Sequence, residues 1–345
     1  MTRSRPLVLL DPFPRNNAMI LRPADRARLE AMAEIRTVES GALPDAMVEA
    51  SLPEVVAILG QTPLPAARIA RAPRLKAVFN VEGNFFPNVD YAACFGRGIR
   101  VGCVAPVFAR PVAEYALALT LDLMRGVTRA DRAFRRGEEA YGWRGNIGVG
   151  TLFGASVGIV GFGNIARALV PLLKPFGGSL RVFDAWLPDA VVREHGAEPV
   201  TLDCLLSNSQ VVIVLAAATS ANRHLLGAAE LGRLRDGGKL VLLSRADVVD
   251  HEALDAALRA GRIEAAIDVF PDEPVAADDP IRTMGCAVLS SHRAGGLAET
   301  LLDIGTMAVD DLDLVLRGLP PVRLQMAQPE TIGLQRSRPG LPAGR

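Results

Sequence analysis

The chain has 345 residues, which is more than one hydrophobic core usually holds, so we expect two domains. Half of the residues are hydrophobic, a composition that excludes a mostly disordered chain. The formal net charge is zero, so the chain lacks the positive excess that binds nucleic acid or an anionic membrane surface.

The N-terminus and the cysteines indicate the cellular compartment. The apolar run at 6–10 is too short for a signal peptide, and no stretch approaches the roughly 18 apolar residues of a membrane helix. The cysteines are scattered without any Cys-x-x-Cys pair, so we expect apolar fillers in a reducing compartment and no bound metal. They are Cys94, Cys103, Cys204 and Cys286. We therefore expect a cytoplasmic protein with no membrane or nucleic-acid partner.

The first hundred residues alternate between strand-like and helix-like runs. The predicted strands are 7–10, 55–59, 75–81 and 99–104, and the predicted helices include 24–35, a short one that closes at 69–71, and 89–95. This alternation is typical of a parallel α/β layer. Pro111 fits the first turn of a helix, which predicts a long helix over 112–136 that passes between domains.

A second α/β series begins after a glycine-rich loop at 138–150. Its predicted strands are 157–160, 180–183, 211–215, 239–244, 265–270 and 287–290, with helices between them. Six strands match the doubly wound six-stranded order, so the fold class is α/β with two doubly wound parallel-sheet domains. A last helix over 297–317 returns the chain to the first domain. The chain beyond 325 is rich in Pro, Gly and Arg, and we expect a loose tail over 331–345.

A Gly-x-Gly-x-x-Ala pattern at 161–166 lies between a predicted strand and the helical run 165–173. Gly161 permits the tight turn, Gly163 lets the backbone approach a pyrophosphate, and Ala166 allows close helix–strand packing. About 20 residues on, Asp184 is placed to accept from a ribose 2′-hydroxyl and to repel a 2′-phosphate, which favours NAD over NADP. The alternative is a structural turn with Asp184 capping a loop. The cofactor-binding residues predicted here are Gly161, Phe162, Gly163, Asn164, Ile165 and Asp184.

Three predicted strands near the end of the chain each lead to a reactive side chain. Arg245 follows 239–244, Glu273 follows 265–270, and His292 follows 287–290. Ligands bind at the carboxyl ends of the strands in an open parallel sheet, so the three residues point to one active site. The alternatives are a surface arginine, a solvated carboxylate and a histidine that caps a turn.

Together these motifs resemble the D-isomer-specific 2-hydroxyacid dehydrogenases over nearly the whole chain. The resemblance implies a Rossmann cofactor domain at 111–299 and a flavodoxin-like substrate (catalytic) domain at 1–110 plus 300–330. It also implies a homodimeric, NAD-dependent oxidoreductase that interconverts a 2-keto acid and a D-2-hydroxy acid. His292 would be the general acid/base, Glu273 would bind its other ring nitrogen, and Arg245 would grip the substrate carboxylate. Further cofactor contacts implied by the family are Ala216, Ala217, Ser244 and Asp268.

The loop at 81–87 departs from the family pattern of Gly-x-Gly followed by Asp. Phe85 and Pro87 stand at the second glycine and the aspartate, whereas Gly83 remains. The substrate contacts expected from this loop are Glu82, Gly83 and Asn84. Three aromatic residues either fill the core or indicate a substrate with an apolar tail: Phe85, Phe86 and Phe108.

Two other functions remain open from the sequence. One is an NAD(H)-sensing, non-enzymatic scaffold or regulator on the same fold, for which the altered loop is the motivation. The other keeps the redox chemistry but replaces the carboxylate substrate by a phosphorus oxyanion. An intact set of Arg245, Glu273 and His292 favours the dehydrogenase, since a sensor needs none of them.

Overall fold

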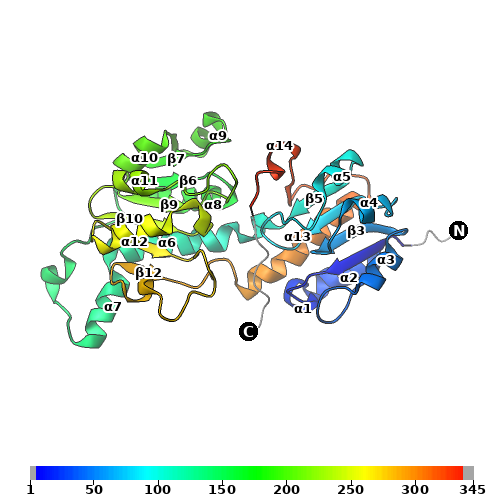
Figure 1. Ribbon diagram of the computed structural model, residues 1–345, viewed down its shortest axis with the longest axis horizontal. Helices are drawn as coiled ribbons and strands as arrows, with labels where there is room; N and C mark the ends of the chain where they lie inside the picture. The colour runs from blue at the N-terminus through cyan, green and yellow to red at the C-terminus, as the bar shows by residue number, and fades with distance from the viewer. Residues whose placement is uncertain (1–4, 337–345) are drawn as a thin grey trace. The chain divides into compact units, whose positions relative to one another are not determined.

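The computed structural model describes residues 5–336, which form two compact units (Figure 1). Unit 1 contains the chain up to Phe108 and again from Gly296, and unit 2 is the continuous segment Ala109–Gly295. Each unit is a sheet covered by helices on both faces, so the predicted α/β class with two doubly wound sheets is confirmed.

Unit 1 is built on a six-stranded sheet with the order β13-β5-β4-β3-β1-β2. Its strands are β1 (Leu7–Asp11), β2 (Glu34–Arg36), β3 (Val55–Gly60), β4 (Ala77–Asn80), β5 (Arg100–Cys103) and β13 (Gln325–Met326). The five parallel strands follow the flavodoxin-like order 2-1-3-4-5, and β13 adds an antiparallel edge. A flavodoxin-like unit is what the sequence predicts for this part of the chain.

The helices of unit 1 bury alternate strand residues on the two faces of the sheet. One face packs against α1 (Asn17–Ile20), α2 (Pro23–Met32) and α13 (Ala298–Leu316), and the other against α3 (Asp45–Ser51), α4 (Ala66–Ala70) and α5 (Tyr91–Gly96). Val8 belongs to the first core and Leu9 to the second, as the two-residue period of a strand requires.

Buried thiols fill part of this unit. Burial raises the pKa of Cys94 to about 11 and that of Cys103 to about 12. Both thiols therefore stay protonated near neutral pH, which suits apolar fillers and not nucleophiles.

Unit 2 is built on a seven-stranded parallel sheet with the order β12-β11-β10-β9-β6-β7-β8. Its strands are β6 (Val157–Val160), β7 (Leu180–Phe183), β8 (Glu198–Pro199), β9 (Val211–Val214), β10 (Gly238–Leu242), β11 (Ile263–Ile267) and β12 (Ala287–Leu289). This is the doubly wound order 3-2-1-4-5-6 with β12 added as a seventh strand, and the order reverses between β6 and β9. The sequence misses β8 because two edge residues carry no hydrophobic pattern.

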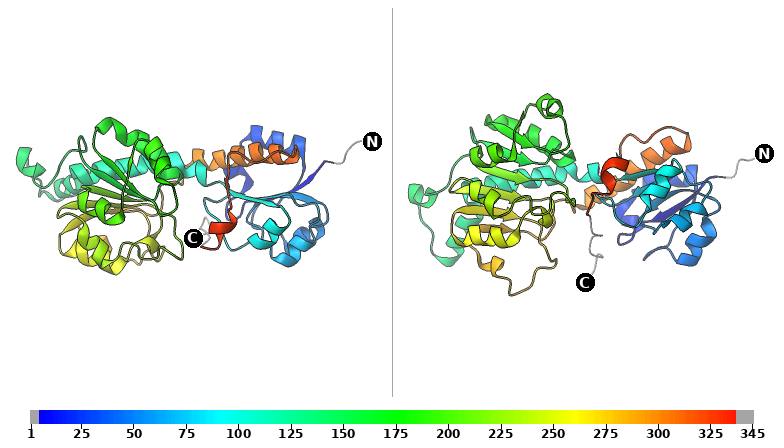
Figure 2. Two further views of the ribbon diagram at one scale, coloured as in Figure 1. Left: turned by 90° about the horizontal axis from the view of Figure 1, so that it is seen from above. Right: turned by 45° about the horizontal axis from the view of Figure 1, so that its top comes forward.

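Helices cover both faces of this sheet (Figure 2). Packed together on one face are α6 (Ala109–Arg125) and α8 (Asn164–Leu173), and the other face carries α10 (Leu202–Asn208), α11 (Ala228–Arg233) and α12 (His251–Arg259). The short helix α9 (Asp189–Glu194) contacts the edge strand β8. The central strands β9 and β10 are buried throughout, which explains why they are apolar apart from Lys239.

Two predicted helices are wrong in their extent. The long helix over 112–136 is broken at Gly126, whose φ of +63° is left-handed and separates α6 from α7 (Val127–Arg136). The helix over 24–35 ends at Met32, because the backbone becomes extended at Ala33. The next residues form β2, where Ile35 pairs with Val8 of β1. In both places tertiary pairing or a glycine overrides a continuous helical pattern.

The C-terminal segment is more ordered than a loose tail up to Arg336. The helix α14 (Pro329–Ile332) includes the first residues of the predicted tail, and the backbone N–H of Ala327 donates to the carbonyl of Val101 at 2.9 Å. Ile332 packs against the core under α3, α4 and α5, so apolar burial orders this stretch. The rest of the predicted tail, 337–345, lies outside the described residues. None of the helices in 5–336 is long and apolar enough to cross a membrane.

Candidate active site

The glycine-rich loop follows β6 at the point where the strand order reverses. Gly161 has a φ of +91°, and a Cβ there would lie 2.5 Å from the Cα of Ala216 in the loop after β9. Only glycine fits that position. A Cβ on Gly163 would meet nothing within 4 Å, so this side of the loop is open for a ligand to approach. Ala166 is fully buried, which lets α8 pack closely on the sheet.

The N-terminus of α8 suits a phosphate group. Asn164 and Ile165 begin the helix, its N-cap is Gly163 without any capping side chain, and its first turn contains no acidic residue. A helix start of this kind directs N–H groups and the positive end of the helix dipole at an anion. The loop and helix therefore fit the pyrophosphate of a dinucleotide.

Asp184 joins the end of β7 to the glycine-rich loop. Its Oδ2 accepts from the backbone N–H of Phe162 at 2.7 Å, and its Oδ1 accepts from those of Trp186 and Leu187 at 2.9 Å. The ring of Phe162 is fully buried, edge-on to His195 with centroids 5.4 Å apart. Phe162 therefore shapes the loop from inside the core and does not offer its ring to a ligand.

The loops after β9 and β10 lie at the same carboxyl edge of the unit 2 sheet as the glycine-rich loop. Ala217 is exposed, and its carbonyl accepts from the amide of Asn222 at 2.7 Å, which braces the loop. Ser244 is buried, and its Oγ has no hydrogen-bond partner among the described residues. A buried hydroxyl without a partner is expected where a ligand supplies one.

The structure brings Glu273 and His292 together. The Nδ1 of His292 and the Oε2 of Glu273 are 2.8 Å apart, and the Oε1 of Glu273 accepts from the backbone N–H of Phe270 at 2.9 Å. The carboxylate is thus fixed by the backbone while it orients the imidazole. The His292 side chain is 45% exposed, so its other ring nitrogen can meet a ligand.

Asp268 holds the loop that carries His292. Its buried carboxylate accepts from the Ser290 hydroxyl at 2.5 Å and from the backbone N–H groups of Arg293 and Ala294 at 3.1 and 3.2 Å. The backbone N–H of His292 donates to the Asp268 carbonyl at 2.7 Å, and His292 has the left-handed φ of +50°. Asp268 is only 1% exposed, so its observed part is to position the histidine.

Arg245 lies at the same edge of the sheet as this pair. Leu242, Ile267 and Leu289 are in register on β10, β11 and β12, and Arg245 and His292 each lie three residues beyond. Arg245 is half-buried, and its guanidinium donates to the Ser244 carbonyl at 2.6 Å. The three neighbouring strands therefore deliver Arg245, Glu273 and His292 to one edge.

In unit 1 the predicted substrate residues Glu82, Gly83 and Asn84 follow β4 at the carboxyl edge of its sheet. Glu82 forms a two-point ion pair with Arg15, one contact being Nη2–Oε2 at 2.8 Å, and Arg15 also donates to the Val81 carbonyl. Sequence reasoning missed Arg15. The available signal was an arginine shortly after a strand, the same signal that indicates Arg245.

The aromatic residues of this loop belong to the core of unit 1. Phe85 and Phe86 are about 95% buried (6% and 5% exposed), and Phe85 packs edge-on to Tyr91 at 6.2 Å. The Phe86 carbonyl accepts from the Tyr91 hydroxyl at 2.7 Å. The half-buried Phe108 covers Gly83, where a Cβ would lie 3.0 Å from the ring. Core filling is therefore the correct interpretation of Phe85 and Phe86.

A metal site needs several ligating side chains grouped closely together. Within 5–336, no three His, Cys, Asp or Glu side chains are grouped so that they could hold an ion.

A family model and a curated relative both match this chain. Residues 117–294 match the family model for the D-isomer specific 2-hydroxyacid dehydrogenase, NAD binding domain. A glyoxylate reductase of Korarchaeum cryptofilum is 33% identical over 262 residues, which cover 75% of this chain and 79% of that enzyme.

Solved structures extend the match to nearly the whole chain. The crystal structure of a phosphoglycerate oxidoreductase from Rhizobium etli is 41% identical, with a TM-score of 0.84 over 94% of this chain and 99% of that one. An NADPH-dependent glyoxylate/hydroxypyruvate reductase from Sinorhizobium meliloti, solved with NADP and malonate, is 26% identical, with a TM-score of 0.69 over 97% of this chain and 100% of that one. The resemblance noted in the sequence is confirmed, and the chain belongs to the D-isomer specific 2-hydroxyacid dehydrogenase family.

Proposed function

We propose that the protein interconverts a 2-keto acid and a D-2-hydroxy acid by hydride transfer, with NAD as its cofactor. The observation that carries the proposal is the 2.8 Å His292–Glu273 pair at the same edge of the unit 2 sheet as the glycine-rich loop. A bound nicotinamide supplies the hydride chemistry that side chains cannot perform.

The side chains then manage the proton and the substrate charge. Glu273 holds Nδ1 of His292, so Nε2 is the nitrogen that gives a proton to the carbonyl oxygen during reduction and takes it back during oxidation. Arg245 binds the substrate carboxylate with its planar fork and polarises the adjacent carbonyl. We assign unit 1 as the substrate domain.

A substrate panel tests this function. We expect NADH oxidation, followed by nicotinamide absorbance, with at least one 2-keto acid from a series that runs from glyoxylate to aromatic keto acids. Turnover of none of them, with NADH still bound, would favour the non-enzymatic NAD(H)-sensing scaffold. Turnover of a phosphorus oxyanion alone would replace the keto acid in the proposal.

The same panel, run with NADH and NADPH, tests the cofactor. The carboxylate of Asp184 follows β7 beside the glycine-rich loop, and its charge repels a 2′-phosphate, so we expect NADH to be preferred. The Sinorhizobium meliloti relative is NADPH-dependent, which makes this comparison necessary. Equal or better turnover with NADPH would contradict the assignment.

The two loop glycines give a matched pair of substitutions. Gly161→Ala places a methyl group 2.5 Å from the Cα of Ala216 at a left-handed φ, so we expect it to destabilise the free protein by about 2 kcal/mol or more. Gly163→Ala has free space, so the melting temperature should not change, but the methyl group occupies the approach of the pyrophosphate. We expect NADH affinity to fall at least about tenfold. Thermal denaturation without cofactor measures the loss of stability, and NADH fluorescence titration measures the loss of affinity. NADH binding by Gly163→Ala at wild-type affinity would contradict the assignment of this loop to the pyrophosphate.

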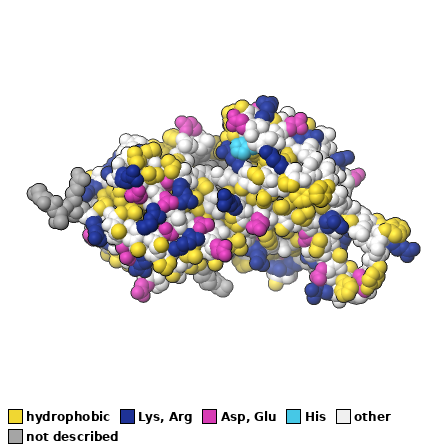
Figure 3. Space-filling model, turned by 180° about the vertical axis from the view of Figure 1, so that it is seen from behind, with side chains coloured by type: hydrophobic (Ala, Val, Ile, Leu, Met, Phe, Trp, Pro, Cys, Tyr) yellow, Lys and Arg dark blue, Asp and Glu magenta, His cyan; other side chains and the backbone are white. Residues whose placement is uncertain are grey.

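We further propose a homodimer that forms through α7 and the residues after it, up to 150. In Figure 1 the segment starts with α7. Figure 3 shows that hydrophobic side chains gather on it. Val127 and Phe134 lie seven residues apart on one face of α7. A monomer rarely exposes so many large apolar groups together. Those that are at least 60% exposed are Val127, Phe134, Tyr141, Trp143 and Ile147.

A single charge on this segment tests the dimer. We expect wild-type protein to elute as a dimer in size-exclusion chromatography with light scattering, and Phe134→Asp to shift it to the monomer. Val322→Asp places the same charge on another exposed apolar residue, 74% exposed in unit 1, and should leave the dimer intact. A monomeric wild-type protein would contradict the proposal.

Cytoplasmic location remains part of the proposal. The free cysteines, three of them with thiol pKa values raised by burial, support a protein that works in a reducing compartment.

A further inference from the structure

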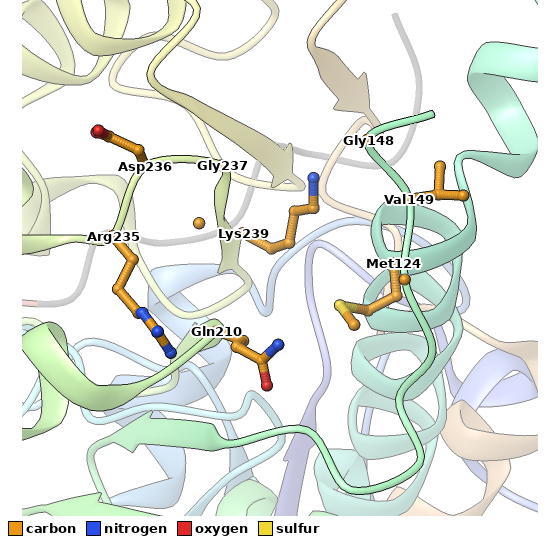
Figure 4. A pocket seen from close by; sticks show the side chains of 10 residues that line it. Met124, Gly148, Val149, Gln210, Arg235, Asp236, Gly237 and Lys239 are labelled. Atoms are coloured by element: carbon orange, nitrogen blue, oxygen red, sulfur yellow. The ribbon is translucent and has the colours of Figure 1, made fainter. Parts of the chain in front are cut away.

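A cavity of about 290 Å³ opens at the amino-terminal edge of the unit 2 sheet (Figure 4). Strands β9 and β10 begin at Val211 and Gly238, beside the cavity, whereas the glycine-rich loop and Arg245 follow the opposite, carboxyl ends of the strands. The cavity is therefore separate from the candidate active site. It is lined by Met124, Gly148, Val149, Gly150, Gln210, Arg235, Asp236, Gly237, Gly238 and Lys239.

Lys239 is an unusual residue for its position. It belongs to β10, a central strand that is buried on both faces, and its side chain is 7% exposed. Such strands are normally apolar throughout, and a buried ammonium is costly unless it is paired. Its Nζ lies 3.0 Å from the Oε1 of Glu264, the residue beside it on β11. One carboxylate contact leaves further donors on the ammonium, whose side chain extends across the cavity toward the 148–149 segment in Figure 4.

Positive charge exceeds negative charge around the cavity. Glu264 is shared between Lys239 and Arg129, whose Nη1 lies 3.5 Å from it. Asp236 is paired with Arg262 at 3.3 Å and so does not neutralise the cavity. Arg235 is exposed and forms no ion pair with any residue in 5–336. Four cations in and beside the lining, namely Lys239, Arg129, Arg235 and Arg262, thus exceed the two carboxylates, Glu264 and Asp236.

The end of α6 does not cancel this charge. The carbonyl of Met124, at the negative end of the helix, accepts from the backbone N–H of Gly150 at 2.8 Å. The amide side chain of Gln210 adds another donor to the wall, with its Oε1 already used by the N–H of Ser156 at 3.0 Å. The wall therefore contains donors from Lys239, Arg235 and Gln210.

We propose that this cavity binds a compact, multivalent oxyanion such as inorganic phosphate or a small dicarboxylate. The ammonium of Lys239 meets it at depth, and Arg235, whose side chain extends toward Gln210 in Figure 4, contributes a second cation to the wall. The volume suits a ligand of this size, near the lower end for small-molecule sites. The site is independent of the hydride transfer proposed above.

Titration calorimetry at constant ionic strength tests the site, with inorganic phosphate and succinate as separate probes and chloride as the blank. We expect saturable binding of at least one probe to the wild-type protein. Arg235→Ala should weaken it about tenfold or more, because it removes a charged donor pair. Lys239→Met should weaken anion binding to a similar degree if the variant folds. If it does not fold, the result with Arg235→Ala decides whether the site exists.

Two control variants separate this site from the others. Arg259→Ala removes an exposed arginine on α12 that pairs with Asp255 and does not line the cavity, and it should retain binding. Arg245→Ala should also retain it, since that arginine lies at the opposite edge of the sheet. Binding that Arg245→Ala abolishes would place the anion in the active site and overturn the proposal. So would binding that survives Arg235→Ala, an equal loss in Arg259→Ala, or the absence of binding of both probes to the wild type.

Discussion

Replacing His292 by alanine is expected to reduce the rate of keto-acid reduction by about 10²- to 10⁴-fold, the usual contribution of a general acid. The imidazole is oriented by Glu273 at 2.8 Å and is 45% exposed, so its removal costs the proton donor and little of the core. Steady-state rates with saturating NADH and the best keto acid of the panel measure the effect.

The left-handed backbone at His292 requires a second variant. Alanine is strained at a φ of +50°, whereas asparagine tolerates this region. His292→Asn should therefore lose activity to the same degree with a melting temperature closer to that of the wild type. If either variant retained full reductase activity, or if NADH binding fell as much as turnover, His292 would not be the proton donor.

Much of the site could be predicted because catalytic residues follow strand ends. The runs before Arg245, Glu273 and His292 are mostly apolar, and in a parallel sheet such runs end at one edge. Gly161 and Gly163 were also predictable, since the close approach of Ala216 and the open side of the loop follow from the strand–turn–helix context.

The parts that could not be predicted depend on contacts between distant segments. The Arg15–Glu82 ion pair joins two loops that are 67 residues apart in the sequence, and neither loop contains a pattern that predicts the other as its partner. Asp268 shows the same limit. The family resemblance places it beside the nicotinamide, which stays a prediction, and it gives no sign that the carboxylate accepts from Ser290, Arg293 and Ala294. A local pattern locates a strand end but does not show which backbone groups fold back onto it.

The predicted ends of helices were wrong where the conformation of a single residue depends on the tertiary structure. Gly126 fits within a helical pattern as one tolerated glycine, and its left-handed φ is visible only in the folded chain. Phe85 and Phe86 illustrate a different case, because an aromatic residue in a substrate loop can face either the ligand or the core. Contact with Tyr91 decides for the core.

Substitution of Arg245 by glutamine is expected to lower kcat/KM for the keto acid by about 10³-fold, because it removes both the charge that binds the carboxylate and the donor that polarises the carbonyl. Arg245→Lys keeps the charge but loses the planar fork, so an intermediate loss should follow. Affinity for NADH should change little in both variants, since the glycine-rich loop and Asp184 belong to β6 and β7.

A substrate without a carboxylate isolates the part played by that charge. The wild-type enzyme should reduce a simple aldehyde or ketone poorly, and Arg245→Gln should lose clearly less activity on it than on the keto acid, because only the polarisation of the carbonyl is removed there. An equal fall for the keto acid and the uncharged analogue would mean that Arg245 acts on the carbonyl or on the fold alone. An unchanged kcat/KM for the keto acid would place the carboxylate at another group, and Arg15 beside Glu82 would then be the first residue to substitute.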